Sequence, residues 1–218
     1  RKFCSFMIER GLNEKIYFSC NMRFGALGLD DYKLMRKAGF RMLLFGLESA
    51  SQETLDRLNK GISVQDIIDG CNWARKSGLE PHITIMVGYP WESRADAFST
   101  LRLARMLMEK GWAITLQSTV VMPYPGMRMY DEALLNGWFR VDPKDYDRFD
   151  MGESVLKTAD MTSEEVVEVC NSIYKIFLSP RYIVKHLARI RSWKDLDFTA
   201  KGFVKVLGHV RDFAKASK

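Results

Sequence analysis

Four separated segments carry the hydrophobic patterns of β-strands. In residues 16–23, apolar residues occupy every second position and polar or aromatic residues lie between them. Residues 41–46 and 82–87 are near-continuous apolar runs, as expected of parallel strands covered on both faces. Residues 113–122 are rich in Thr and Val, with two polar residues in the middle. We therefore predict four strands.

Segments with helical spacing lie between and after these strands. Residues 30–38 end at Gly39, a residue that favours the turn after a helix. Ser63 and Asp66 have the spacing of a capping box that begins a helix. We expect further helices after Ser51, around residues 98–108, up to Asn136, from Thr162 (with Glu165 as a capping box) to Phe177, and around residues 203–210. The alternation of strands and helices predicts a parallel α/β sheet, which right-handed crossovers would curl.

The first strand suggests how far this sheet curls. One of its faces carries Tyr17, Ser19, Asn21 and Arg23, and is too polar to be buried under a helix. It suits the inside of a barrel that holds a polar ligand. Four strands cannot close an ordinary barrel, so we expect further strands upstream of Arg1. The chain also begins without Met and within an amphipathic helix, and we interpret it as a fragment of a longer protein.

The character of the sequence changes after Met122, where a turn and a short helix are followed by an irregular aromatic stretch and then by helices. We assign residues 1–140 to the α/β barrel and residues 141–218 to a mostly helical extension. The net charge of +6 is concentrated in residues 175–218, where eleven Lys and Arg accompany three Asp. Such a segment could contact nucleic acid or acidic lipid. The alternative is the solvated face of helices that pack on another surface.

Several classes of protein do not match this sequence. It has no apolar run of about 18 residues and no signal peptide, which predicts a cytoplasmic chain without a membrane span. The four cysteines are 16, 51 and 99 residues apart, unlike the short loops of metal and iron–sulfur sites. We interpret them as core residues and predict no metal ligand in this chain. His82 and His186 are isolated, and we expect structural roles for both.

Candidate chemistry lies where the strands end, because ligands of parallel α/β folds bind there. The four strand ends carry Asn21 and Arg23; Glu48, after Gly46; Gly88, Tyr89 and Pro90; and Met122. Each feature has a structural alternative: Glu48 could cap the following helix, Arg23 could pair with Glu48, and Gly88 could form a tight turn. The repetition of such residues at four successive strand ends favours a ligand site.

Three motifs at these ends resemble those of one enzyme superfamily. They are Phe45-Gly46-Leu47-Glu48-Ser49-Ala50-Ser51 with Lys60-Gly61-Ile62-Ser63, then Met86-Val87-Gly88-Tyr89-Pro90-Trp91-Glu92-Ser93, then Met122-Pro123-Tyr124-Pro125-Gly126. In order and spacing they resemble the fourth, fifth and sixth strands of radical S-adenosylmethionine (SAM) enzymes. The similarity is to the branch with cobalamin-binding domains, which includes the anaerobic magnesium-protoporphyrin cyclase type and many methyltransferases.

The resemblance implies a six-stranded partial barrel of TIM type, of which residues 1–140 supply strands three to six. SAM would bind across the strand tips beside a [4Fe–4S] cluster, and its reductive cleavage would give a 5′-deoxyadenosyl radical. Carried over by position, Glu48 and Ser19 would bind polar parts of SAM, and Arg23 its carboxylate or ribose. The backbone at Gly88, Tyr89 and Pro90, and at Met122, would line the adenine. No general acid or base is implied, because the radical chemistry belongs to the cofactors.

The chain departs from this family in two places. The three-cysteine cluster loop is absent, and so is the glycine-rich acidic motif after the family's second strand. We therefore expect the cluster ligands upstream of this chain, and an isolated chain that is inactive. The expected partners are a small-molecule substrate and the upstream half of the barrel. Whether a separate upstream cobalamin domain takes part, and whether the outcome is methylation or cyclisation, stays open.

Two other functions are compatible with the sequence. One is an unrelated (β/α) barrel enzyme that handles phosphate, which would need a Gly-rich anion loop late in the barrel, and none is evident. The other is a degenerate, non-catalytic α/β barrel module that binds RNA or a protein partner through the basic C-terminal tail. A three-cysteine loop upstream would favour the radical SAM enzyme, and its loss would favour the degenerate module.

Overall fold

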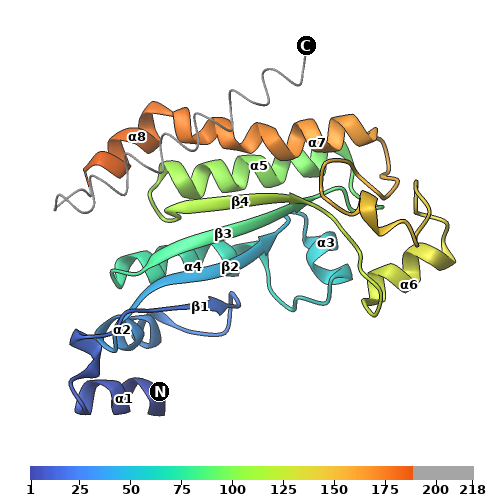
Figure 1. Ribbon diagram of the computed structural model, residues 1–218. Helices are drawn as coiled ribbons and strands as arrows, with labels where there is room; N and C mark the ends of the chain where they lie inside the picture. The colour runs from blue at the N-terminus through green and yellow to red at the C-terminus, as the bar shows by residue number, and fades with distance from the viewer. Residues whose placement is uncertain (189–218) are drawn as a thin grey trace.

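Strands and helices alternate through residues 1–188, the part of the chain that this computed structural model describes (Figure 1). The strands are β1 (Phe18–Met22), β2 (Phe40–Glu48), β3 (Glu80–Val87) and β4 (Thr115–Val120). The α-helices are α1 (Lys2–Glu9), α2 (Leu29–Lys37), α3 (Gln52–Arg57), α4 (Val64–Lys76), α5 (Arg94–Glu109), α6 (Arg128–Leu135), α7 (Ser163–Ser172) and α8 (Pro180–Leu187). Three short 3-10 helices are η1 (Leu12–Glu14), η2 (Tyr146–Arg148) and η3 (Ile173–Leu178). The helix expected around residues 203–210, and most of the basic segment, lie outside the described residues.

The four strands form one parallel sheet in the order β1-β2-β3-β4. Each strand is therefore next to its neighbour in sequence, and all four carboxyl ends lie at the same edge (Figure 1). This confirms the predicted α/β class with parallel strands. The register between β2 and β3 shifts between Gly46 and Glu48, at the tip of β2.

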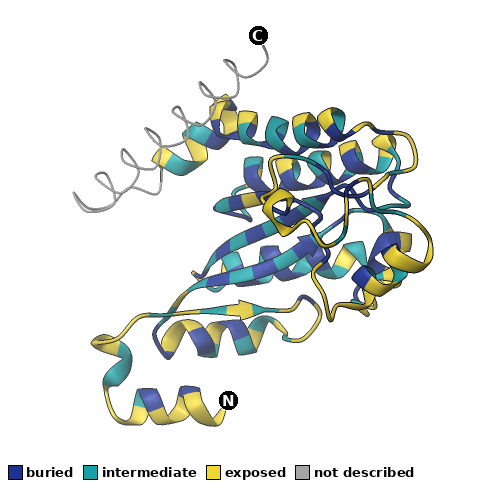
Figure 2. Cartoon of the chain, turned by 45° about the vertical axis from the view of Figure 1, so that its right-hand side comes forward, coloured by how far each residue is buried: buried dark blue, intermediate teal, exposed yellow. Residues whose placement is uncertain are grey.

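The sheet has two unequal faces. On the outer face, β2 buries Leu43, Phe45 and Leu47, and these side chains join one apolar core with residues of α1, α2, α4 and α5. On the opposite face, which we call the inner face, every second residue of β2, β3 and β4 is only partly buried or, at Gln117, exposed (Figure 2). β1 is exposed on this face at Ser19 and Asn21. The alternation predicted for the first strand is confirmed.

Local sequence signals explain where the helices begin. Ser63 and Thr162 each accept a hydrogen bond from the backbone N–H three residues later, within complete capping boxes. Both were predicted. A third capping box, at Ser93, begins α5. Gly39 follows α2 with a φ of 100°, and its position leaves no room for a side chain beside the backbone of Ile16.

Some predicted boundaries are wrong. The first strand begins at Phe18 rather than Ile16, because the N–H of Ile16 closes a turn onto the carbonyl of Leu12. The fourth ends at Val120, three residues before Pro123. The helix expected to reach Phe177 tightens into η3 after Ser172.

The cysteines also differ from one another. Cys4, Cys71 and Cys170 are buried, as expected of core residues, whereas Cys20 is only partly buried. All four are free thiols.

The segment after β4 returns to the sheet. The loop that follows α6 leads into α7, which packs beside α5 and covers the outer face of β3 and β4 (Figure 1). Val166 and Cys170 of α7 join Val87, Ala97 and Val120 in an apolar cluster. In the part of the chain that the structure describes, no helix is long and apolar enough to cross a membrane.

Candidate functional site

The second strand ends at Glu48, whose carboxylate lies against the backbone of Gly46. Glu48 has a φ of 62°, a conformation uncommon for a residue with a side chain. Its side chain lies over Gly46, where an added Cβ would come within 2.2 Å of Oε1 of Glu48. Only glycine therefore permits this position of the carboxylate. The register shift in β2 is located at the same two residues.

Lys60 fixes one oxygen of this carboxylate. Its Nζ donates a hydrogen bond of 2.7 Å to Oε1 of Glu48, and the exposed fractions of the two side chains are 32% and 13%. The other oxygen, Oε2, accepts no hydrogen bond within residues 1–188. The site thus presents one fixed and one available carboxylate oxygen.

Arg23, the residue after the end of β1, joins the same cluster. Its Nη2 donates to the backbone carbonyl of Lys60, and the side chain remains exposed. Arg23, Glu48 and Lys60, which we call the Glu48 cluster, therefore lie together at the tips of β1 and β2. The cation paired with Glu48 is Lys60, so the alternative of an Arg23–Glu48 ion pair is wrong. The helix-cap alternative is also wrong, because Ser51 accepts the hydrogen bond that caps α3.

Ser19 is not part of this cluster. It lies on the same face, but it pairs with Met42, six residues before Glu48 on β2. At about 3.3 Å per residue, this separates the two backbones by roughly 20 Å.

A buried carboxylate organises the tip of the third strand. Glu92 is fully buried, and its Oε2 accepts a hydrogen bond of 2.6 Å from the N–H of Gly88. Burial raises the pKa of Glu92 to about 7, against the opposing effect of hydrogen bonds from Gly88 and Tyr89. Oε1 is buried without a partner within the described residues. Glu92 therefore shapes the turn at Gly88 and sits close to a change of protonation at neutral pH.

The residues at the tips of β3 and β4 differ in their burial and in what they pack against. The backbone of Gly88 adopts a φ of 101° and faces Val166, whereas Pro90 is partly buried. Tyr89 and Met122 turn their side chains into a second apolar cluster, with Val121, Ala133, Val141, Phe149, Val155 and Leu156. Burial raises the pKa of the Tyr89 hydroxyl. Both residues are buried as a whole, with exposed fractions of 1% for Tyr89 and 4% for Met122.

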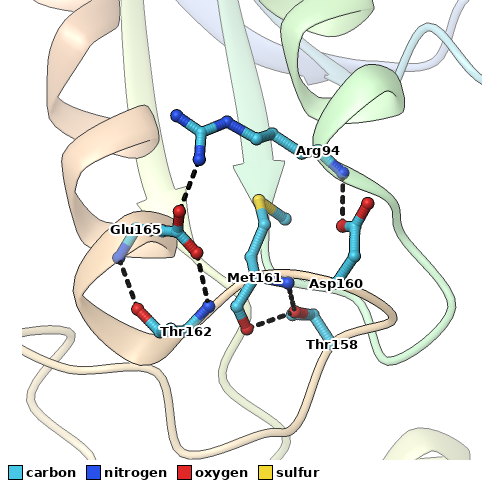
Figure 3. A network of polar contacts seen from close by, with 6 residues as sticks. All are labelled: Arg94, Thr158, Asp160, Met161, Thr162 and Glu165. Atoms are coloured by element: carbon cyan, nitrogen blue, oxygen red, sulfur yellow. Dashed lines mark hydrogen bonds and ion pairs between the residues drawn. The ribbon is translucent and has the colours of Figure 1, made fainter.

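A polar network joins the start of α5 to the segment before α7 (Figure 3). Asp160 accepts a hydrogen bond of 2.7 Å from the backbone N–H of Arg94, while the Arg94 guanidinium pairs with Glu165. Thr158 closes its loop through both backbone groups of Met161. Ser93, the N-cap of α5, directly follows Glu92, so this network lies next to the turn that Glu92 forms with Gly88.

Comparison with known proteins identifies the family. A model described as the radical SAM superfamily matches residues 4–104. An uncharacterised methyltransferase of Pyrococcus horikoshii is 30% identical over 156 residues, which cover 71% of this chain and 33% of that protein. The anaerobic magnesium-protoporphyrin IX monomethyl ester cyclase of Cereibacter sphaeroides is 25% identical over 218 residues, covering 99% of this chain and 33% of that protein. The chain belongs to the radical SAM superfamily.

A solved radical SAM structure has the same fold. The methyltransferase TsrM from Kitasatospora setae, with cobalamin and a [4Fe–4S] cluster bound, superposes with a TM-score of 0.55 at 14% identity. The match covers 80% of this chain and 34% of that one. The chain thus spans about a third of the length of the curated relatives and of this structure.

The described residues match the two cofactors of radical SAM enzymes differently. No group of three or more His, Cys, Asp or Glu side chains within residues 1–188 could hold a metal ion. The [4Fe–4S] cluster therefore has no site among them, and the prediction that its ligands lie upstream stays a prediction. The Glu48 cluster, by contrast, offers the carboxylate, the cations and the bare backbone that a zwitterionic nucleoside requires.

Sequence reasoning missed two residues of this site. Lys60 and Glu92 both stand within the quoted motifs, but neither had a predicted role. For Glu92 a signal existed, since a carboxylate four residues after a turn glycine can reach back to its N–H. For Lys60 the signal was weak, because twelve residues and a helix separate it from Glu48.

Proposed function

We propose that this chain forms the SAM-binding and substrate-facing wall of a radical SAM enzyme. The observation that carries this proposal is the Glu48 carboxylate, which lies over Gly46 with one oxygen held by Lys60 and the other available. It stands at the carboxyl end of a parallel strand, where ligands of such folds bind. The proposed whole enzyme cleaves SAM reductively, and its outcome is methyl transfer or cyclisation.

The proposed contacts follow the chemistry of SAM. Oε2 of Glu48 accepts a hydrogen bond from the ammonium or a ribose hydroxyl of SAM. The remaining guanidinium donors of Arg23 face the SAM carboxylate or ribose. The backbone at Gly88, Tyr89, Pro90 and Met122 lines the adenine, as the family resemblance implies. When bound, SAM supplies the sulfonium carbon–sulfur bond that is cleaved in the reaction.

Ser19 lies further from the proposed SAM site than Glu48 and Arg23 do. Its partner on β2, Met42, lies roughly 13 Å along the strand from Gly46, over which the Glu48 carboxylate is held, so Ser19 cannot bind the same group of SAM as Glu48. We therefore assign SAM to the Glu48 cluster and the backbone of the β3 and β4 tips. Ser19 is left to face another part of the inner face.

The remaining parts of the enzyme are proposed to lie outside this chain. They are the three cysteines that hold the [4Fe–4S] cluster, the missing strands of the barrel and, if present, a cobalamin-binding domain. Two relatives support this division: the chain covers a third of each, and they are described as a methyltransferase and a cyclase. The free thiols support a reducing, cytoplasmic location for the enzyme.

SAM binding by the intact protein tests the proposal. The protein is reconstituted anaerobically with iron and sulfide, and SAM affinity is measured together with SAM cleavage. We expect Glu48→Ala to weaken SAM binding at least several-fold, because a charge-assisted hydrogen bond is worth about 1.5–3 kcal/mol. Glu53→Ala is the matched control, since Glu53 pairs with Arg57 on the exposed side of α3. Equal SAM affinity of the Glu48 variant and the wild type would contradict the proposed site.

A further inference from the structure

The side chains of His82 and Gln117 lie on the inner face, nearer to the amino ends of the strands than the Glu48 cluster. In the parallel register, Leu44 pairs with His82 and His82 with Thr115, which places these residues in one row across three strands. The next row toward the carboxyl ends contains Gly46, Thr84 and Gln117. Because Glu48 covers Gly46, His82 and Gln117 lie one to two rows from its carboxylate.

His82 and Gln117 each keep a donor or acceptor that the hydrogen bonds within the sheet do not use. Nδ1 of His82 is bonded to Oγ1 of Thr115 at 2.8 Å, which fixes the ring. Nε2 of His82 makes no hydrogen bond within residues 1–188, and neither does the exposed amide of Gln117. The neighbouring hydroxyl of Thr84 is directed to the carbonyl of Phe45. We call His82, Thr84, Thr115 and Gln117 the inner-face strip. The imidazole of His82 and the amide of Gln117 are therefore its groups that can bind a ligand.

The charges beside this strip on β2 and β3 are paired, and the Arg23 guanidinium, which forms no ion pair within residues 1–188, lies beyond the end of β1, two strands away from His82. Above it, Lys60 neutralises Glu48, and below it, Arg41 pairs with Glu80 at 3.3 Å. Burial lowers the pKa of His82, so its imidazole is neutral at pH 7. An anion placed here would lose water without gaining a cation, which is unfavourable in a partly buried site.

Apolar side chains frame the two polar groups. Leu44 lies beside His82, and Met86 follows Thr84 along the inner face of β3. Both are partly buried and offer contact area without charge. The strip is thus complementary to a molecule with an apolar body and one neutral hydrogen-bonding group.

We propose that His82 and Gln117 bind an uncharged hydrogen-bonding group of the substrate, such as an amide or a hydroxyl, and select against a carboxylate or phosphate at that position. This inference rests on the proposed function, because it takes the inner face to be the substrate side of the SAM site. It assigns His82 a ligand-binding role where the sequence suggested a structural one.

A pair of isosteric probes tests this selectivity. The intact protein is labelled with 15N in its histidine rings, and benzamide and benzoate are titrated separately while the His82 Nε2 resonance is followed. We expect benzamide to shift this resonance in the millimolar range, with a dissociation constant at least tenfold lower than that of benzoate. His186 is the internal control, because it stacks on Tyr182 away from this face.

Two substitutions locate the binding. Gln117→Ala is expected to weaken benzamide binding at least threefold, as the loss of one neutral hydrogen bond would. Because the Gln117 side chain is exposed, this change should leave folding intact. Gln65→Ala, on the exposed side of α4, is the matched control and should change nothing.

Several outcomes would overturn the inference. They are benzoate binding as tightly as benzamide, an unchanged benzamide affinity in Gln117→Ala, and a His82 resonance that responds to neither probe because another segment covers it. SAM affinity, measured on the same samples, separates this inference from the proposed function. Intact Glu48-dependent SAM binding without benzamide selectivity would refute only the substrate class. Selective benzamide binding without SAM binding would refute the proposed function instead.

Discussion

Nζ of Lys60 lies 2.7 Å from Oε1 of Glu48, although twelve residues and helix α3 separate the two along the chain. The pair is only partly exposed, so it is screened less by water than a surface ion pair. Its geometry holds the carboxylate over Gly46 and leaves Oε2 available. Lys60 therefore acts as a positioning residue for Glu48.

A double-mutant cycle measures this positioning. We expect Lys60→Met to weaken SAM binding by less than Glu48→Ala does, because the carboxylate remains but is no longer held. The double variant should lose no more affinity than Glu48→Ala alone, since Lys60 acts through Glu48. SAM affinity of the four proteins gives the coupling energy by calorimetry. Fully additive losses would show that Lys60 contacts SAM independently.

Gly46→Ala should displace the carboxylate without unfolding the protein. The added Cβ would collide with the end of the flexible Glu48 side chain, which can move away. We expect a loss of SAM affinity close to that of Glu48→Ala and a midpoint of thermal unfolding near that of the wild type. Gly28→Ala is the control, because no atom lies within 4 Å of its added Cβ. An unchanged SAM affinity in Gly46→Ala would mean that the position of the carboxylate is unimportant.

Glu92 predicts a pH dependence of stability. Its pKa is about 7 in the folded protein and about 4.5 in the unfolded chain, so the folded state binds the proton more tightly. Its contribution to stability is therefore complete below about pH 4.5 and is lost as the pH rises through about 7. The loss reaches roughly 3 kcal/mol, at about 1.4 kcal/mol per pH unit.

Urea unfolding at several pH values checks this contribution. Glu92→Gln keeps an acceptor for the N–H of Gly88 but cannot ionise, so its stability should change less between about pH 5 and about pH 8 than that of the wild type. Glu132→Gln is the control, because Glu132 forms an i,i+4 pair with Arg128 on the surface. Parallel pH profiles for wild type and Glu92→Gln would show that Glu92 does not titrate in this range.

Gly88→Ala should destabilise the protein through two separate effects. The φ of 101° is unfavourable for any residue with a Cβ, and the added Cβ would lie 2.9 Å from Cγ1 of Val166. We expect the free energy of unfolding to fall by at least about 2 kcal/mol. Gly126→Ala isolates the backbone effect, since its φ is 87° and no atom lies within 4 Å.

A second variant isolates the steric effect at Gly88. If the collision with Val166 matters, Gly88→Ala combined with Val166→Ala should cost less than the sum of the two single changes. Denaturant unfolding of the single and double variants provides the comparison. Strict additivity would leave backbone strain as the sole cause of the destabilisation.

Most of the sheet could be predicted because its signals are local. Apolar runs separated by capping boxes and glycines gave the order of strands and helices, and the polar alternation around Asn21 indicated an inner face that helices leave uncovered. The apolar runs of the second and third strands suggested cover on both faces. In the described residues, helices cover only one of them, and Met42, Leu44 and Met86 stay partly buried on the other.

The site was less predictable because it depends on contacts between distant residues. Strand ends placed Glu48 and Gly88 correctly at one edge of the sheet, but no periodicity indicates that Lys60 returns to Glu48. Nor does the sequence show which way Tyr89 and Met122 turn. Their side chains pack against residues of the irregular segment 139–156, which lies far from both in the sequence pattern of strands and helices.

The cover that α7 provides for β3 and β4 affects how this protein can be divided. Val166 and Cys170 seal Val87, Ala97 and Val120 from water, and Val155 and Leu156 do the same for Tyr89 and Met122. A polypeptide that stopped near residue 140 would leave these apolar surfaces bare and prone to aggregation. For expression or domain transplantation, the smallest soluble unit should therefore extend at least through Cys170.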